Sequence, residues 1–117
     1  MAFVVSRRNQ FLVRQRPANV VNSHLWEFPN IEIMKDDGDP LQNARRVFGS
    51  EPPSLAPLCE IKHTITRYRI SLETYRIQMT YRDFLAGDGN WMSLPQLRRL
   101  AFASAHKKIL NRLQEGR

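Results

Sequence analysis

The sequence contains a single cysteine, Cys59, among its 117 residues. One cysteine cannot form an intramolecular disulfide, nor can it supply the ligands of a cysteine-bound zinc ion or iron–sulfur cluster. Long apolar runs are also missing, since none approaches the roughly 20 residues that a membrane-spanning helix needs. The beginning, MAFVVSRR, is unlike a signal peptide because its charges follow a very short apolar run. We therefore expect an intracellular protein in a reducing compartment, in a bacterium the cytoplasm or nucleoid, with no membrane partner.

Acidic residues are few relative to basic ones. The chain has 18 Lys and Arg against 11 Asp and Glu, which gives a formal net charge of +7. This excess favours a polyanionic partner such as nucleic acid, and a solvated basic surface is the alternative. A chain of this length can bury one core but not two, so we predict a single domain over residues 1–117. Because the sequence opens directly on a predicted strand, we expect it to be a fragment of a longer protein.

Hydrophobic periodicity predicts several short strands and one long hairpin. Strands are expected at residues 2–6, 10–16, 25–28, 30–34, 60–66, 68–79 and 91–92. In the longest of them the apolar residues change from even-numbered positions, such as Ile70 and Leu72, to odd-numbered positions, such as Ile77. This change predicts a bulge near residues 73–74.

Three helices are predicted from their end signals. Asp39 can cap a helix that begins with Pro40, and Gly49 is a natural stop, so this helix should span residues 40–48. The sequence Ser93-Leu94-Pro95-Gln96 is a capping box that opens a short helix to about residue 100. Ser104 should cap the last helix. Helices on both faces of a mixed sheet would make an α+β protein with an α/β/α sandwich.

Three segments carry a resemblance to a known family. The first is FLVRQRP at Phe11–Pro17 followed by LWEFPN at Leu25–Asn30, the second is IKHTITRYRI at Ile61–Ile70, and the third is WMSLPQLRRLAFASAHKKIL at Trp91–Leu110. In this order they resemble the C-terminal domain of adenine DNA glycosylases of the MutY type. The resemblance implies a Nudix-like fold and a role in base excision repair. It also implies a parent enzyme that hydrolyses an N-glycosidic bond in an N-terminal domain holding an iron–sulfur cluster.

The resemblance also points to a DNA-reading corner between the two long strands. The family has Phe-Ser-His there, and the matching residues of this chain are Ile65, Thr66 and Arg67. Ile65 keeps an apolar wedge without aromatic stacking, Thr66 keeps a hydroxyl, and Arg67 replaces a histidine by a fixed cation. The implied partners are duplex DNA with 8-oxoguanine opposite adenine and the N-terminal catalytic domain of the same chain. Periodicity alone allows a plain hairpin corner instead.

Basic side chains near these segments are candidates for phosphate contacts. Arg67 adjoins the corner, and the other candidates are Lys62, Arg69, Arg14 and Arg16. The alternative for each is a solvated charge on a strand. Other residues of these segments are expected to have structural roles. Trp26 and Phe28 are expected in the core. His63 is expected to be half-buried and hydrogen-bonded.

The sequence lacks the acids of a Nudix hydrolase, which needs carboxylates on a helix to hold magnesium. When the family pattern is aligned to end at Gly49, those positions hold Gln42, Asn43, Arg46 and Val47. We therefore expect no catalytic residue, no metal and no cofactor in this chain, and no enzyme activity of its own. The competing interpretations are a degenerate Nudix-like module that binds another protein and a nucleotide hydrolase with unusual ligands.

Overall fold

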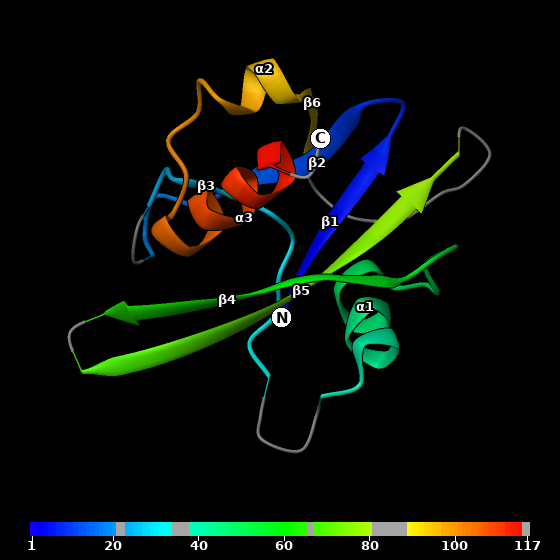
Figure 1. Ribbon diagram of the computed structural model, residues 1–117, viewed down its shortest axis with the longest axis horizontal. Coiled ribbons are helices and arrows are strands. Elements are labelled where there is room, and N and C mark those ends of the chain that lie inside the picture. The colour runs from blue at the N-terminus through cyan, green and yellow to red at the C-terminus, as the bar shows by residue number, and fades with distance from the viewer. Residues whose placement is uncertain (21–22, 34–37, 66, 81–88, 116–117) are drawn as a thin grey trace.

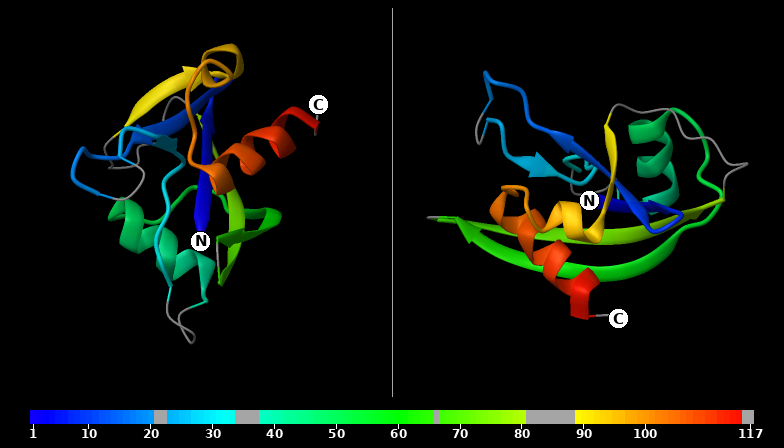
Figure 2. Two further views of the ribbon diagram at one scale, coloured as in Figure 1. Left: turned by 90° about the vertical axis from the view of Figure 1, so that its left-hand side faces the viewer. Right: turned by 90° about the horizontal axis from the view of Figure 1, so that it is seen from above.

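The computed structural model describes residues 1–20, 23–33, 38–65, 67–80 and 89–115, with the backbone alone at residues 65 and 68. In these residues six strands form one mixed sheet: β1 (Ala2–Arg7), β2 (Gln10–Gln15), β3 (Trp26–Glu27), β4 (Ala56–Ile65), β5 (Tyr68–Met79) and β6 (Asn90–Ser93). The described helices are α1 (Pro40–Phe48), α2 (Leu94–Leu97) and α3 (Ser104–Glu115). None of them is long and apolar enough to cross a membrane. Figures 1 and 2 show α1 and α3 on opposite sides of the sheet.

The centre of the sheet is β1, which pairs with β5 in parallel and with β2 antiparallel. Its side chains alternate between two cores. Ala2 and Val4 pack in the cluster that contains residues of α3, whereas Phe3 and Val5 pack in the cluster that contains residues of α1. A strand covered on both faces needs an uninterrupted apolar run, which explains AFVV at the start of the chain. The predicted α+β architecture, with a mixed sheet between helices, is confirmed.

Along β5 the apolar residues change from even-numbered to odd-numbered positions because this strand, like β1, is covered on both faces. Leu72 belongs to the core beneath α3, and Ile77 and Met79 belong to the core beneath α1. One end of β5 therefore buries even-numbered residues and the other end buries odd-numbered ones. No extra residue in β5 is required to produce this pattern.

The bulge itself lies in the neighbouring strand. Pro57 pairs with Tyr75 and Cys59 pairs with Thr74, so Leu58 is the additional residue, and it belongs to β4. The prediction of a bulge in β5 near residues 73–74 is thus wrong about the strand, although these residues lie opposite it. Periodicity in one strand cannot tell which of two paired strands holds the extra residue.

Local signals set the helix ends. Asp39 accepts a hydrogen bond from the N–H of Leu41 at 3.1 Å, and Gly49 adopts a left-handed φ of 74° while its N–H donates to the carbonyl of Arg45. The predicted bounds of α1 are confirmed. The capping box of Ser93 and Gln96 is present, but α2 ends at Leu97, earlier than expected.

The two short strands predicted around Pro29 are only partly present. Trp26–Glu27 forms β3, and Asn30 makes an isolated bridge with Ala2. The expected strand at 30–34 is wrong for residues 31–33, which lie in no strand. The chain runs here past the beginning of β1. The N–H of Ile31 donates to the carbonyl of Met1, but residues 31–33 do not pair with β1 as a strand.

Candidate nucleic-acid interface

The long hairpin of β4 and β5 projects beyond the rest of the sheet (Figure 1). Toward its end Lys62 pairs with Ser71 and Thr64 pairs with Arg69. These four side chains are exposed and lie on the face opposite Ile61, which packs in the core beneath α3. Lys62 and Arg69 make the end of this face basic, whereas nearer the centre of the sheet Glu60 lies on the same face and accepts from the Ser71 hydroxyl at 2.9 Å.

The corner of this hairpin is where sequence reasoning places the DNA reader. Ile65 pairs with Tyr68, so residues 66 and 67 connect the strands. Arg67 is exposed. Thr66 lies outside the described residues, and at Ile65 the description is limited to the backbone. The structure thus brings Lys62, Arg67 and Arg69 together on one hairpin.

Helix α3 braces the hairpin from its other face. The ammonium nitrogen of Lys108 lies 3.0 Å from Nδ1 of His63 and 3.4 Å from the carbonyl oxygen of Lys62. Since an ammonium group can only donate, Nδ1 of His63 must accept, which places the ring proton on Nε2. The prediction of a half-buried, hydrogen-bonded His63 is confirmed. This contact also brings a cation of α3 to the hairpin.

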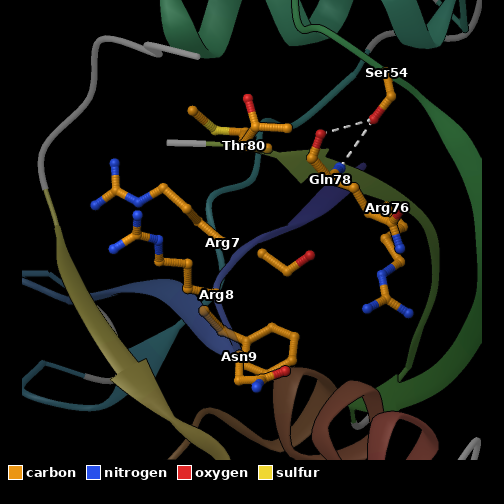
Figure 3. A pocket seen from close by; sticks show the side chains of 10 residues that line it. Arg7, Arg8, Asn9, Ser54, Arg76, Gln78 and Thr80 are labelled. Atoms are coloured by element: carbon orange, nitrogen blue, oxygen red, sulfur yellow. Dashed lines mark hydrogen bonds between the residues drawn. The ribbon is translucent and has the colours of Figure 1, made fainter. Parts of the chain in front are cut away.

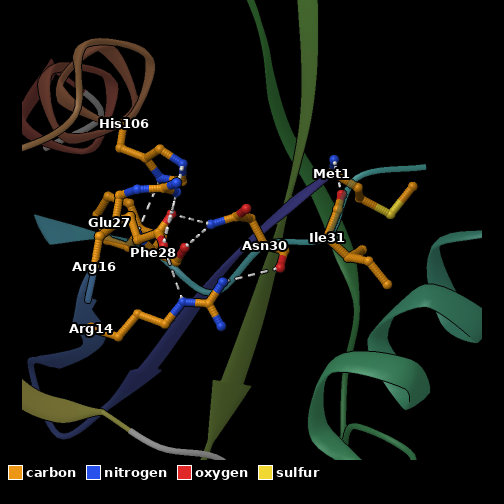
Figure 4. Close-up of polar contacts among 8 residues, drawn as sticks. All are labelled: Met1, Arg14, Arg16, Glu27, Phe28, Asn30, Ile31 and His106. Carbon is orange, nitrogen blue, oxygen red and sulfur yellow. Dashed lines mark hydrogen bonds and ion pairs between the residues drawn. The ribbon is translucent and has the colours of Figure 1, made fainter. Parts of the chain in front are cut away.

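Arg14 and Arg16, the other candidates for phosphate contacts, lie on and directly after β2, which β1 separates from the hairpin. Both are paired with Glu27, which is 4% exposed (Figure 4). Nε of Arg14 and Nη1 of Arg16 each lie 3.3 Å from a carboxylate oxygen of Glu27. The carboxylate offsets part of their charge, and it holds both guanidinium groups in place. These two arginines are therefore not part of the hairpin surface.

His106 is a buried member of this cluster that sequence reasoning missed. The N–H of Phe28 donates to its Nδ1 at 3.1 Å, and its Nε2 lies 3.9 Å from Glu27 (Figure 4). Burial lowers the pKa of His106 to about 4, although the charge of Glu27 opposes this shift. The imidazole is neutral at pH 7, and it ties α3 to the segment after β3.

A sequence signal for His106 did exist. His106 precedes Ile109, Leu110 and Leu113 at helical spacings of three, four and seven residues, and all four are buried. A polar residue on such a face is expected to be buried with a partner. Phe28 is fully buried and Trp26 packs against the same core, which confirms their predicted core positions.

In Nudix hydrolases the helix that corresponds to α1 carries metal-binding acids, and here α1 has an amide and a guanidinium group at those positions. Asn43 is fully buried and its amide donates to the carbonyl of Asp39 at 3.0 Å, while the Arg46 guanidinium donates to Oδ1 of Asn43. A fixed cation beside an amide does not fit a magnesium ion. Among the described residues there is no group of three or more His, Cys, Asp or Glu that could hold a metal. Burial raises the pKa of the Cys59 thiol, which lowers its reactivity at neutral pH.

Comparisons with known proteins place this fold. The C-terminal domain of mouse MUTYH, solved in complex with human PCNA, is 22% identical, with a TM-score of 0.77 over 98% of this chain and 86% of that one. A MutT protein from Methanosarcina mazei Go1 is 14% identical, with a TM-score of 0.76 over 98% of this chain and 91% of that one. NrtR of Shewanella oneidensis, in complex with a 27mer DNA, is 17% identical with a TM-score of 0.69, over 97% of this chain and 59% of that one.

These likenesses concern the fold, a mixed sheet with a few helices. No match was found among curated protein sequences. The family model described as the NUDIX domain matches residues 1–112, nearly the whole sequence. The chain therefore belongs to the NUDIX domain family.

Proposed function

We propose that this domain recognises 8-oxoguanine opposite adenine in duplex DNA and serves as the non-catalytic, C-terminal part of an adenine DNA glycosylase. The observation that carries the proposal is the projecting β4–β5 hairpin. The residues at its corner align with the segment that the MutY family uses to recognise the base. Lys62, Arg67 and Arg69 are exposed on this hairpin. A projecting basic hairpin can approach a duplex without a clash from the rest of the domain, and its charges favour phosphate contacts.

The corner has the side chains that such a reader needs. 8-Oxoguanine differs from guanine at N7, which donates instead of accepting, and at the oxygen on C8. The hydroxyl of Thr66 can accept from the altered N7, and it would discriminate against guanine when its own proton is donated to another acceptor, because the hydroxyl oxygen would then face the N7 acceptor of guanine. Ile65 would wedge against the base, and Arg67 would contact a phosphate.

The same proposal assigns no catalysis to this chain. The buried Asn43 and the Arg46 guanidinium occupy the helix positions that hold metal-binding acids in Nudix hydrolases. Adenine excision would belong to an N-terminal catalytic domain of the same protein, with its iron–sulfur cluster, and this chain would be its docking partner. An abasic-site assay on an adenine–8-oxoguanine duplex tests this part, and turnover by the pure chain would refute it.

The reading role is tested by DNA binding. Fluorescence anisotropy would compare two duplexes, one with 8-oxoguanine opposite adenine and one with guanine opposite adenine. Thr66→Ala should reduce the discrimination between them by about 1–2 kcal/mol, the value of one buried hydrogen bond. Thr64→Ala is the matched control, because Thr64 is exposed on the same hairpin. Equal discrimination by the wild type and Thr66→Ala would mean that a residue other than Thr66 recognises 8-oxoguanine.

The phosphate role of Arg67 has a different signature. Arg67→Ala should lower the affinity for both duplexes by a similar factor, because phosphates are the same in each. The slope of log K against log salt should become shallower by about 0.9 for one lost phosphate contact. A change confined to the 8-oxoguanine duplex would instead assign Arg67 to base recognition.

A second candidate is a Nudix-like module that binds a protein and not DNA. It is favoured by the mouse MUTYH domain, which was solved in complex with PCNA. It is also favoured by Ile70, whose side chain is 41% exposed on the hairpin. A salt titration separates the two candidates, since a steep loss of duplex affinity with salt supports DNA and absent binding at low salt supports the protein partner.

A further inference from the structure

The strand β4 lies at one edge of the sheet. In the part of the chain that the structure describes, it pairs with β5 on one side and with no strand on the other. An edge strand has N–H and C=O groups along its free side, and these can pair with another extended chain. The hydrogen bonds of β5 show which residues of β4 carry those groups.

Ser54, two residues before β4, fixes the orientation of the β5 backbone. Its hydroxyl accepts from the N–H of Gln78 at 2.9 Å and donates to the Gln78 carbonyl at 3.1 Å (Figure 3). The backbone groups of Gln78 therefore point toward the side of β4. Every second residue of a strand points its N–H and C=O to the same side, and so those of Leu72 also point toward β4. Leu72 pairs with Ile61, which is thus hydrogen-bonded to β5.

The residues that alternate with Ile61 face the other way. The N–H and C=O groups of Glu60, Lys62 and Thr64 point away from β5, and among the described residues they have no backbone partner in another element. The position of Lys108 agrees with this assignment. Its ammonium group donates to the carbonyl of Lys62 at 3.4 Å, as expected for a carbonyl on the free edge.

The other end of β4 is protected against pairing. Pro57 has no N–H, and it pairs with Tyr75, whose backbone groups point toward β1 and not toward β4. Leu58 is the extra residue of the bulge. Proline, bulges and lysine are common means by which proteins keep edge strands from pairing. Here they leave residues 60–64 accessible, apart from the one carbonyl that Lys108 covers.

Cations of α3 lie along the same edge. Lys108 and Arg112 are four residues apart, so they share one side of the helix, and both are exposed. Burial raises the pKa of the Cys59 thiol, and the charge of Arg112 opposes this shift, which puts Arg112 near β4. Neither cation forms an ion pair with an acidic residue in the described ranges. A chain that paired with β4 would place every second side chain on the face of α3, beside these charges.

We propose that the free edge of β4 binds an extended, acidic segment of a partner protein as an additional strand. Such a strand supplies both donors and acceptors for the backbone of residues 60–64, whereas the phosphates of a nucleic acid supply acceptors alone. Carboxylates on its α3 side would pair with Lys108 and Arg112. A second copy of this chain, paired antiparallel, would place its own α3 cations beside those of the first, and like charges oppose that arrangement.

This proposal does not depend on recognition of 8-oxoguanine. It rests on the backbone of residues 60–64 and on α3, whereas the proposed DNA reader is the corner of the hairpin. Unchanged DNA discrimination in Thr66→Ala would therefore leave it untouched, and the experiments below contain no damaged DNA.

Amide hydrogen exchange of the whole chain, followed by NMR, tests the pairing. In the free protein the amides of Glu60, Lys62 and Thr64 should exchange much faster than those of Ile61 and His63, which bond to β5. The probe is a synthetic peptide of alternating Glu and Val. It should protect the first three amides and change the other two little. The same peptide methylated at every backbone amide nitrogen keeps its charge but cannot donate, and it should protect none of them.

Variants separate the backbone contribution from that of charge. Thr64→Pro removes an outward N–H but no hydrogen bond between β4 and β5, and it should weaken peptide binding by about fivefold. Thr64→Ala is the matched control, because it loses the same side chain and keeps the N–H. Arg112→Gln should weaken binding by about threefold, and Arg112→Lys should restore most of it. Arg45→Gln removes a charge from α1, across the sheet, and should leave binding unchanged. Thermal melting confirms that each variant is folded.

Three results would overturn the proposal. Equal binding of the acidic peptide and its methylated form would show attraction by charge alone, and the wild type provides this result even if Thr64→Pro does not fold. Equal protection by a peptide with Lys in place of Glu would remove the role of the α3 cations. Protection of the same amides by undamaged duplex DNA, or by a rise in protein concentration without peptide, would assign the edge to a nucleic acid or to a second copy of this chain.

Discussion

Acidification should destabilise this domain over a pH range that His106 sets. The imidazole is 7% exposed, and its Nδ1 accepts the N–H of Phe28 at 3.1 Å. Protonation would place a hydrogen on Nδ1, directly against that donor, and would also bury a positive charge. Burial holds the pKa of His106 at about 4, although Glu27 favours the charged form, while Arg14 and Arg16 disfavour it.

The size of the effect follows from the two pKa values. His106 has a folded-state pKa of about 4 against about 6.5 in an unfolded chain, so the unfolded state binds the proton first as the pH falls. Its contribution to stability is fully present above pH 6.5 and is lost as the pH falls toward 4. At 1.36 kcal/mol per unit the whole loss is about 3 kcal/mol, and about 2 kcal/mol of it falls between pH 7 and pH 5.

Urea denaturation at pH 7, 6 and 5, followed by circular dichroism, measures this loss. His106→Asn keeps an oxygen near the position of Nδ1, and that oxygen can accept from Phe28 without titrating. The wild type should lose about 2 kcal/mol more than His106→Asn between pH 7 and pH 5. His24→Asn is the control, because His24 is exposed and has a left-handed φ of 66°, which suits asparagine. If His106→Asn keeps the pH dependence of the wild type, the reasoning is refuted.

Substitutions at three further residues test other contacts by urea denaturation at pH 7. Glu27→Gln should lower the free energy of unfolding by about 2 kcal/mol, because it removes the charge that two arginines share; an unchanged value would mean that these ion pairs do not stabilise the fold. Gly89→Ala should cost about 1–3 kcal/mol, since a Cβ would lie 2.7 Å from the carbonyl oxygen of Val13 at a φ of 156°, and a neutral result would contradict this packing. Asp39→Ala should cost about 1 kcal/mol through the lost helix cap, whereas Asp39→Asn should recover most of it.

Local chemistry made part of the structure predictable from the sequence. The ends of α1 follow from Asp39, Pro40 and Gly49, which act on backbone groups within a few residues of themselves. The β1–β2 hairpin follows from two apolar, β-branched runs on either side of a short polar turn, and the β4–β5 hairpin follows from alternating apolar residues. The position of the candidate DNA reader came from a motif, and the identity of Thr66 as its recognising group stays a prediction.

Tertiary contacts decided the rest. Arg14 and Arg16 looked like free cations in the sequence, and only the pairing of β2 with β3 places Glu27 between them. The parallel pairing of β1 with β5, two strands that are far apart in the sequence, is likewise a tertiary contact that no local pattern reports.

The sequence by itself determined the family, the bounds of α1 and the basic residues at the end of the long hairpin. Those properties depend on residue types and on hydrogen bonds that span a few positions. Only the tertiary structure decided that His106 is a buried, neutral link to Phe28, 78 residues away, and which strand holds the bulge. Such contacts depend on how the two faces of the sheet are covered, and one-dimensional periodicity does not encode which residue lies opposite which.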